Sequence, residues 1–75
     1  MPLEKLLRLP EVTDRTGLRR AAIYDAIKRG VFPRPVRIGR RAVAWPESEV
    51  QAWIAERVAD ARERDVEAVR ASAAG

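Results

Sequence analysis

The sequence predicts a small, mainly α-helical domain with one β-hairpin, and three observations support this prediction. Two short amphipathic helix patterns are joined at Gly17. A proline-containing segment then leads into an alternating apolar and polar pattern around Gly39, and a third amphipathic pattern follows Pro46. The chain has 75 residues, which is room for one domain.

The first predicted helix covers residues 9–17 and follows a lead-in of eight residues, in which Leu6 or Leu7 is expected to pack on the core. Pro10 suits the first turn of a helix because its missing N–H has no helical acceptor there. Gly17 suits the left-handed conformation that often ends a helix.

The second predicted helix covers residues 18–29 and ends at Gly30. Arg19 occupies its expected N-cap position, where Ser, Thr or Asp is more usual. The residues at helical spacing that form its expected apolar face are Leu18, Ala22, Ile23, Ala26 and Ile27.

Residues 31–35 predict a stiff extended connector, because Pro33 and Pro35 fix their own φ angles and restrict the residues before them. Two short strands are expected around a turn that contains Gly39. In a simple register, the hairpin residues that face inward are Val36, Ile38, Val43 and Trp45.

A third helix is expected to open at Pro46, with two acidic residues in its first turn. The residues that repeat at three- and four-residue steps along its amphipathic stripe are Val50, Trp53, Ile54 and Arg57 or Val58. Residues 58–75 are expected to form an Ala-rich, charged helical extension and a frayed tail, with disorder over residues 71–75. Because only Val66 and Val69 among the larger apolar residues lie beyond Val58, the core must come from the first 58 residues.

Basic residues concentrate in the front of the chain. The formal net charge is +4 and the pI is about 10.6. Residues 1–45 hold 11 basic and 4 acidic side chains, whereas residues 46–75 hold 4 basic and 7 acidic ones, giving +7 and −3. This division predicts one cationic surface suited to a polyanion.

The composition argues against catalysis. The chain has no Cys and no His, which excludes disulfides, the usual zinc ligands and any Cys- or His-based nucleophile–base pair. No apolar run approaches the ~20 residues of a membrane span, and the first eight residues lack a signal-peptide apolar region. We expect a cytoplasmic, nucleoid-associated protein that is not an enzyme and needs no cofactor, metal or small-molecule ligand.

Two helices joined at a glycine and followed by an arginine-tipped hairpin suit the reading of duplex DNA. An α-helix about 10–12 Å wide fits the major groove, and a neighbouring hairpin places cations on the backbone or in the minor groove. This predicts a winged helix-turn-helix over residues 9–57, with recognition helix 18–29 and wing 37–43. The expected DNA-contacting residues are Arg19, Arg20, Ala21, Tyr24, Lys28, Arg37, Arg40 and Arg41.

Several of these residues have a second interpretation. Tyr24 either donates its hydroxyl to a phosphate or packs half-buried with a wet tip. Asp25 would repel phosphate unless it pairs with Arg29 at i+4, and we favour that structural role. Trp45 and Trp53 could stack on single-stranded bases, but their apolar, periodic settings predict core positions.

The motifs along residues 8–54 are, in order, RLPEV, TGL, IY, KRGVFPRPVRIG, VAW and ESEVQAWI. This succession resembles the AlpA family of small prophage-associated transcriptional regulators, which are similar to excisionases and related to MerR-type winged-helix proteins. The sequence departs from that pattern at Arg19, Ala21 and Ala22, where members tend to have Ser or Thr, and in its extension beyond residue 57.

The resemblance implies sequence-specific binding of double-stranded DNA near a phage or mobile-element promoter or attachment site. A transcriptional regulator is the main prediction. One alternative is an excisionase-like recombination directionality factor that bends attachment-site DNA. Another, of a different class, is a small protein-interaction module that acts through the C-terminal helix. Self-association and cooperative binding on DNA are both left open.

Overall fold

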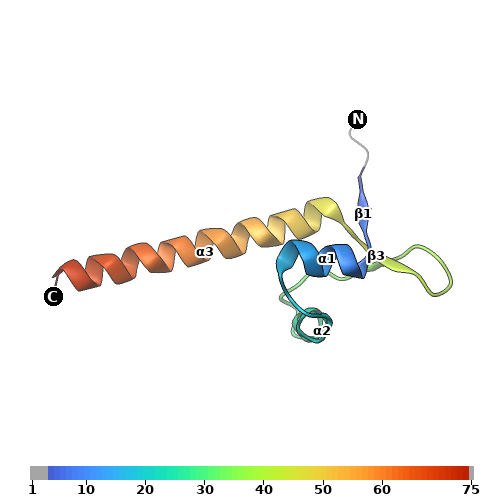
Figure 1. The fold of residues 1–75 in the computed structure, drawn as a ribbon, viewed down its shortest axis with the longest axis horizontal. Coiled ribbons are helices and arrows are strands. Elements are labelled where there is room, and N and C mark those ends of the chain that lie inside the picture. The colour runs from blue at the N-terminus through green and yellow to red at the C-terminus, as the bar shows by residue number, and fades with distance from the viewer. Residues whose placement is uncertain (1–3, 75) are drawn as a thin grey trace.

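The computed structural model describes residues 4–74, with side chains described for residues 4–70. Its elements are β1 (Leu6–Leu7), α1 (Leu9–Thr16), α2 (Arg20–Lys28), β2 (Val36–Arg37), β3 (Val43–Pro46) and α3 (Glu47–Ala74). The strands form an antiparallel sheet in the order β1-β3-β2. The elements gather into one body from which α3 projects (Figure 1). The predicted mainly helical fold with a β-hairpin is confirmed, and β1 is a strand that the sequence did not predict.

The turn between α1 and α2 depends on Gly17. This residue ends α1 in the left-handed region at φ 73°, where its N–H donates to the carbonyl oxygen of Thr13 across 2.9 Å. The hydroxyl of Thr16 then accepts a hydrogen bond from the N–H of Leu18 at 3.2 Å. These bonds set the direction in which the chain enters α2.

The second helix begins later than the sequence predicted, at Arg20. Arg19 is its N-cap, as expected, and is extended at φ −79° and ψ 160°. Ile23 and Ala26 are buried, but Ala22, which we expected on the apolar face, is exposed. The reason is geometric, since Ala22 lies about 100° around the helix from Ile23 and therefore at the edge of the buried face.

β1 ties the N-terminal segment to the rest of the fold. Leu7 pairs with Trp45 across the sheet and is fully buried, whereas Leu6 is exposed. An ion pair between Arg15 Nη1 and Glu47 Oε2, 2.7 Å apart, joins α1 to the start of α3. These contacts hold β1, α1 and α3 together around β3.

Glu4 accepts two hydrogen bonds at the N-terminus of α3. Its Oε1 lies 2.6 Å from Oγ of Ser48 and 3.1 Å from the backbone nitrogen of Ser48. Both hydrogen bonds stabilise the carboxylate and lower the pKa of Glu4 below its ordinary value of 4.5. The bond from the Ser48 hydroxyl has the larger effect, and the bond from the Ser48 backbone N–H has the smaller one.

This arrangement predicts a pH-dependent effect of Glu4→Gln. The contribution of the carboxylate to stability is present above the ordinary pKa and is lost as the pH falls through the lowered folded-state pKa. At neutral pH the variant should therefore unfold at a lower temperature than the parent, and the difference should vanish in acid. Thermal unfolding followed by circular dichroism measures it. An equal difference at neutral and acidic pH would contradict this account.

The core forms between the sheet and the three helices. Its buried members are Leu7, Val12, Ile23, Ala26, Phe32, Trp45 and Val50. Leu9, Leu18, Ile27, Val43, Trp53 and Ile54 are partly buried and pack against it. All of these residues precede residue 58, as the distribution of large apolar side chains predicted.

The hairpin forms where the sequence predicted it, but two of its side chains lie on the other face. Val36 pairs with Ala44, and Arg37 pairs with Val43. Val36 and Ile38, which we expected to face inward, are exposed. Because Val36 pairs with Ala44, Val36 and Ile38 lie on the face of the sheet opposite to Val43 and Trp45, in a strand at the edge of the sheet.

α3 continues well beyond the body. Val50 is buried and Ile54 is half-buried, whereas every residue from 55 to 70 is exposed. The helix runs to Ala74, so its bounds include residues 71–74, which we expected to be disordered. Gly75, also in that prediction, and residues 1–3 of the lead-in lie outside the described residues. No helix in the described part of the chain has the length and apolarity needed to cross a membrane.

Candidate nucleic-acid interface

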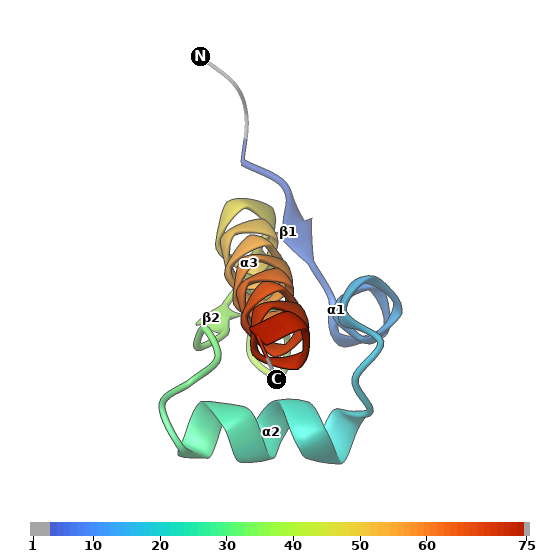
Figure 2. The same cartoon turned by 90° about the vertical axis from the view of Figure 1, so that its left-hand side faces the viewer.

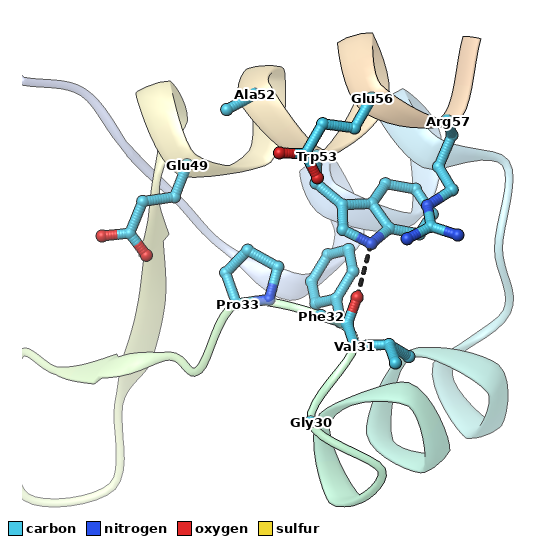
Figure 3. A pocket seen from close by; sticks show the side chains of 9 residues that line it. All are labelled: Gly30, Val31, Phe32, Pro33, Glu49, Ala52, Trp53, Glu56 and Arg57. Atoms are coloured by element: carbon cyan, nitrogen blue, oxygen red, sulfur yellow. Dashed lines mark hydrogen bonds between the residues drawn. The ribbon is translucent and has the colours of Figure 1, made fainter. Parts of the chain in front are cut away.

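Two tryptophan side chains hold the segment that joins α2 to the hairpin. The indole N–H of Trp53 donates to the carbonyl oxygen of Val31, with 2.7 Å between nitrogen and oxygen (Figure 3). The indole N–H of Trp45 donates in the same way to Pro33, at 2.9 Å. Phe32, between these two carbonyls, is buried and packs edge-on against Trp53 with ring centroids 5.0 Å apart. The connector is therefore fixed on both sides of Phe32, and α2 and the hairpin keep one relative position.

This arrangement confirms the predicted core positions of Trp45 and Trp53. Trp45 is fully buried, and Trp53 is partly buried against the core cluster. The indole N–H is the only hydrogen-bond donor of each side chain, and it binds a backbone carbonyl oxygen of the connector. Trp45 is thus enclosed by the core, whereas Trp53 packs against the core cluster with part of its side chain exposed.

The outer face of α2 carries most of the predicted contact residues on this helix. α2 lies along one side of the body and runs crosswise to the direction of α3 (Figure 2). Ile23 and Ala26 point into the core, so positions on the opposite side of the helix face solvent. The exposed predicted residues of this segment are Arg19, Arg20, Ala21, Tyr24 and Lys28.

Tyr24 and Asp25 both make contacts within the protein. The ring of Tyr24 packs edge-on toward Trp45 at 6.4 Å and lies 5.7 Å from the guanidinium carbon of Arg20. These contacts support the packing role of Tyr24. They do not test whether its hydroxyl donates a hydrogen bond to a phosphate. Asp25 Oδ2 lies 3.2 Å from Nε of Arg29, which confirms the predicted i,i+4 pair. That pair offsets the one acidic charge on the outer face of α2.

The β2–β3 connection carries the other predicted cations. Its ends are closed by a hydrogen bond from the N–H of Ile38 to the carbonyl oxygen of Ala42, at 2.9 Å. Arg37 lies in β2, and Arg40 and Arg41 lie in the bend that follows, where all three are exposed. The loop extends from the body on the side opposite to the projecting end of α3 (Figure 1).

Ion pairing divides the basic residues into two groups. Lys5, Arg15 and Arg29 each lie within 4.0 Å of an acidic side chain. Among the described side chains, the ion pairs include none of the cations on the predicted surface, which are Arg19, Arg20, Lys28, Arg37, Arg40 and Arg41. Of the paired cations, Arg15 joins two helices, whereas Lys5 and Arg29 are paired at the exposed surface. The cations on α2 and on the β2–β3 loop have no ion pair among the described side chains.

A shallow groove on another side of the body has a different character. It lies between α3 and the connector, and Trp53 forms its floor (Figure 3). Glu49 and Glu56 stand on its α3 side, and the guanidinium carbon of Arg57 lies 5.3 Å from the Trp53 ring centroid. Because carboxylates border it, this groove is unsuited to phosphate, and the cationic surface lies elsewhere.

The sequence did not reveal the residues that support this surface. The indole–carbonyl bonds join positions 12 and 22 residues apart, and no local pattern signals them. The pairing of Arg15 with Glu47 is equally nonlocal. The candidate contact residues were predicted from residue type, helical spacing and the turn around Gly39, and all of them are exposed.

Comparisons with known proteins agree with the motif order. Residues 5–58 match the family model described as "Prophage CP4-57 regulatory protein (AlpA)". An uncharacterized protein, ORF88, of Enterobacteria phage P4 is 50% identical over 56 residues, which cover 75% of this chain and 64% of the phage protein. The chain thus spans somewhat less than two thirds of that relative.

A second relative carries a functional name. The "DNA-binding transcriptional activator AlpA" of Escherichia coli (strain K12) is 36% identical over 59 residues, which cover 71% of this chain and 84% of that protein. The region that matches the family model includes α1, α2, the sheet and the first part of α3, and ends where α3 leaves the body. On these matches, the chain belongs to the AlpA family of prophage regulatory proteins.

Proposed function

We propose that this protein is a phage- or mobile-element-associated transcriptional regulator that binds double-stranded DNA in a sequence-specific manner. The observation that carries the proposal is the unpaired cationic charge on two exposed, described elements, α2 and the β2–β3 loop, which one connector holds in a fixed relation. Membership of the AlpA family and the name of the E. coli relative support it.

In this proposal α1 and α2 act as a helix-turn-helix, and α2 enters the major groove. A helix of about 10–12 Å in diameter fits that groove. The exposed side of α2 carries the small Ala21 beside the extended side chains of Arg20 and Lys28, with Tyr24 and Asp25 also exposed on the helix. Arg20 reaches base edges, where a guanidinium fork can bind guanine in bidentate fashion. Arg19 and Lys28, at the two ends of α2, contact phosphate, and Ala21 lies against a thymine methyl group.

The β2–β3 loop acts as the wing. Arg40 and Arg41 at its tip bind the phosphate backbone or the minor groove, and Arg37 supports them from β2. The exposure of Val36 and Ile38 fits a hairpin that reaches away from the core. Since phosphate contacts carry no base information, the wing contributes affinity and orientation, whereas α2 contributes discrimination.

A salt titration tests the phosphate contacts. If about four to six cations contact phosphate in each protomer, log K should fall with log salt at a slope of about −3.6 to −5.4, at about −0.9 per contact. The double variant Arg40→Ala/Arg41→Ala should make this slope shallower by about 1.8 and weaken binding to all duplexes alike. Fluorescence anisotropy with labelled duplexes measures both quantities.

Arg64→Ala provides the matched control, since it removes one positive charge from the projecting part of α3. It should leave the slope nearly unchanged. Binding that does not respond to salt would refute the proposed surface. The same conclusion would follow if Arg64→Ala changed the slope as much, per charge removed, as the loop variant does.

A further inference from the structure

The projecting half of α3 has a side-chain pattern that the DNA-binding surface does not explain. Val58, Val66 and Val69 are exposed by 43%, 49% and 67%, and Val69 is the most exposed of the large apolar residues among the described side chains. A shallow hollow lined in part by Val66 and Val69 lies on the same stretch. The match to the family model ends at residue 58, so this segment is a feature of this chain beyond the matched domain.

A helix in this position has little to stabilise it within one copy. Every residue from 55 to 70 is exposed, so the described part of its own chain buries none of this segment. An isolated helix of this length is marginal in water, because most helical stability in proteins comes from packing an apolar face. A partner that covered the valines would supply that packing.

The spacing of residues on this segment is that of a two-helix seam. Val58, Arg62, Asp65 and Val69 follow one another at steps of four, three and four residues. This alternation keeps side chains in line along the contact between two supercoiled helices. The seam therefore has a valine at each end and an opposite pair of charges, Arg62 and Asp65, in its middle.

We infer that this seam binds a second copy of the chain in antiparallel orientation. A twofold axis midway between residues 63 and 64 places Val58 against Val69 of the second copy. The same axis places Arg62 against Asp65 of the second copy, so each charge meets its opposite. Along the seam, a contact between Val58 and Val69 therefore lies at each end and two contacts between Arg62 and Asp65 lie between them. The same surface on both copies is thus complementary to itself.

The charges select this orientation. In a parallel, in-register pair, Arg62 would face Arg62 and Asp65 would face Asp65, which places like charges together in both central layers. Ala59, Ala61, Val66 and Ala68 flank the seam, and the same twofold axis places Val66 beside Ala61 of the second copy. The three alanines are small enough to let two helices approach closely. The polar centre specifies orientation at a cost in affinity, so the dimer is weak.

The pairing also sets the distance between the two bodies. At 1.5 Å per residue, the Val50 residues of the two copies lie about 40 Å apart along the helix axis. Two DNA half-sites one helical turn apart are separated by about 34–36 Å. Occupation of paired half-sites rests on the proposed DNA binding, whereas the pairing of α3 does not.

Charge exchange in the full-length chain tests the pairing. Arg62→Asp and Asp65→Arg each place like charges in both central layers, so each variant alone should dimerise at least about tenfold more weakly than the parent. An equimolar mixture of the two variants should recover the association, because the two acidic side chains of one variant would then face the two arginines of the other. Sedimentation equilibrium from micromolar to millimolar concentration measures this.

Cysteine cross-linking tests the orientation, and the chain has no native Cys to interfere. Val58→Cys chains mixed with Val69→Cys chains should form a disulfide-linked heterodimer under mild oxidation. Val58→Cys alone should not, because the two positions 58 would lie about 16 Å apart, beyond the reach of a disulfide of about 7 Å.

Three results would overturn the inference: a monomer at every concentration, no recovery in the charge-exchanged mixture, or efficient cross-linking of Val58→Cys with itself. Binding of one duplex half-site by each variant is measured in parallel at concentrations where the parent is monomeric. Since residues 58–70 lie outside the proposed DNA surface, that binding should be unchanged. If the parent protein itself does not bind DNA, that result would count against the proposed function and not against the dimer.

Discussion

Replacing Trp45 by Ala should abolish cooperative folding and, with it, DNA binding. Trp45 is fully buried, pairs with Leu7 in the sheet and holds the connector through Pro33. Truncating a buried Trp to Ala costs about 3–5 kcal/mol. A chain of this length has about 4–11 kcal/mol of total stability, at about 0.05–0.15 kcal/mol per residue. The loss equals or exceeds the stability at the lower end of this range, where a small domain whose core comes from its first 58 residues is expected to lie.

Thermal and urea unfolding followed by near-ultraviolet circular dichroism measure this effect, since that signal reports on packed aromatic rings. Trp53→Phe is the matched comparison, because it keeps an aromatic ring beside Phe32 and removes the indole N–H that binds Val31. It should cost about 1 kcal/mol, the net value of one hydrogen bond, and leave a folded protein. A Trp45→Ala protein that still unfolds cooperatively near the parent's midpoint would contradict the role assigned to this residue.

Replacing Arg20 by Ala should reduce discrimination between DNA sequences as well as affinity. Arg20 is exposed at the start of α2, has no ion pair among the described side chains, and lies over the ring of Tyr24. A side chain that contacts a base edge contributes about 1–3 kcal/mol of discrimination, so specific binding should weaken by about 5- to 150-fold. Binding to unrelated duplexes should weaken much less.

Arg20→Lys separates geometry from charge. Lysine keeps the positive charge but lacks the planar fork that makes bidentate contacts. It should preserve most of the non-specific affinity and lose discrimination. Titration of each variant against a preferred duplex and a scrambled duplex gives the ratio directly. Equal losses on both duplexes would place Arg20 on phosphate and remove it from base recognition.

The local elements were predictable because their signals lie within a few residues. Gly17 ends α1 and Arg19 caps α2 as the sequence indicated, and the spacing of Ile23 and Ala26 identified the buried face of that helix. Phe32 was likewise expected in the core and is buried there.

The nonlocal features were not predictable in the same way. β1 contains only two residues, which is too short for a periodic pattern to indicate a strand. Its partner strand lies near position 45, far from it in the sequence. Val36 and Ile38 alternate as a half-buried strand would, but both are exposed, in a strand at the edge of the sheet. A short alternating pattern cannot reveal whether a second layer exists.

The candidate interface shows the same division. Its exposed cations were predictable, because residue type and helical spacing place them on a solvent-facing side. The neutralisation of Arg29 was predictable, because Asp25 lies one helical turn away, but that of Arg15 was not, since its pairing with Glu47 joins two helices that are distant in sequence. The anchoring of the connector by Trp45 and Trp53 also became visible only in the folded chain.

Selection of binding sites from a pool of random duplexes tests the central claim most directly. If α2 reads base edges while the β2–β3 loop holds the backbone, the parent protein should enrich one short motif, and Arg20→Ala should relax at least one position within it. A pool that remains random after repeated selection with the parent, at a salt concentration where the protein still binds DNA, would contradict sequence-specific recognition by this surface.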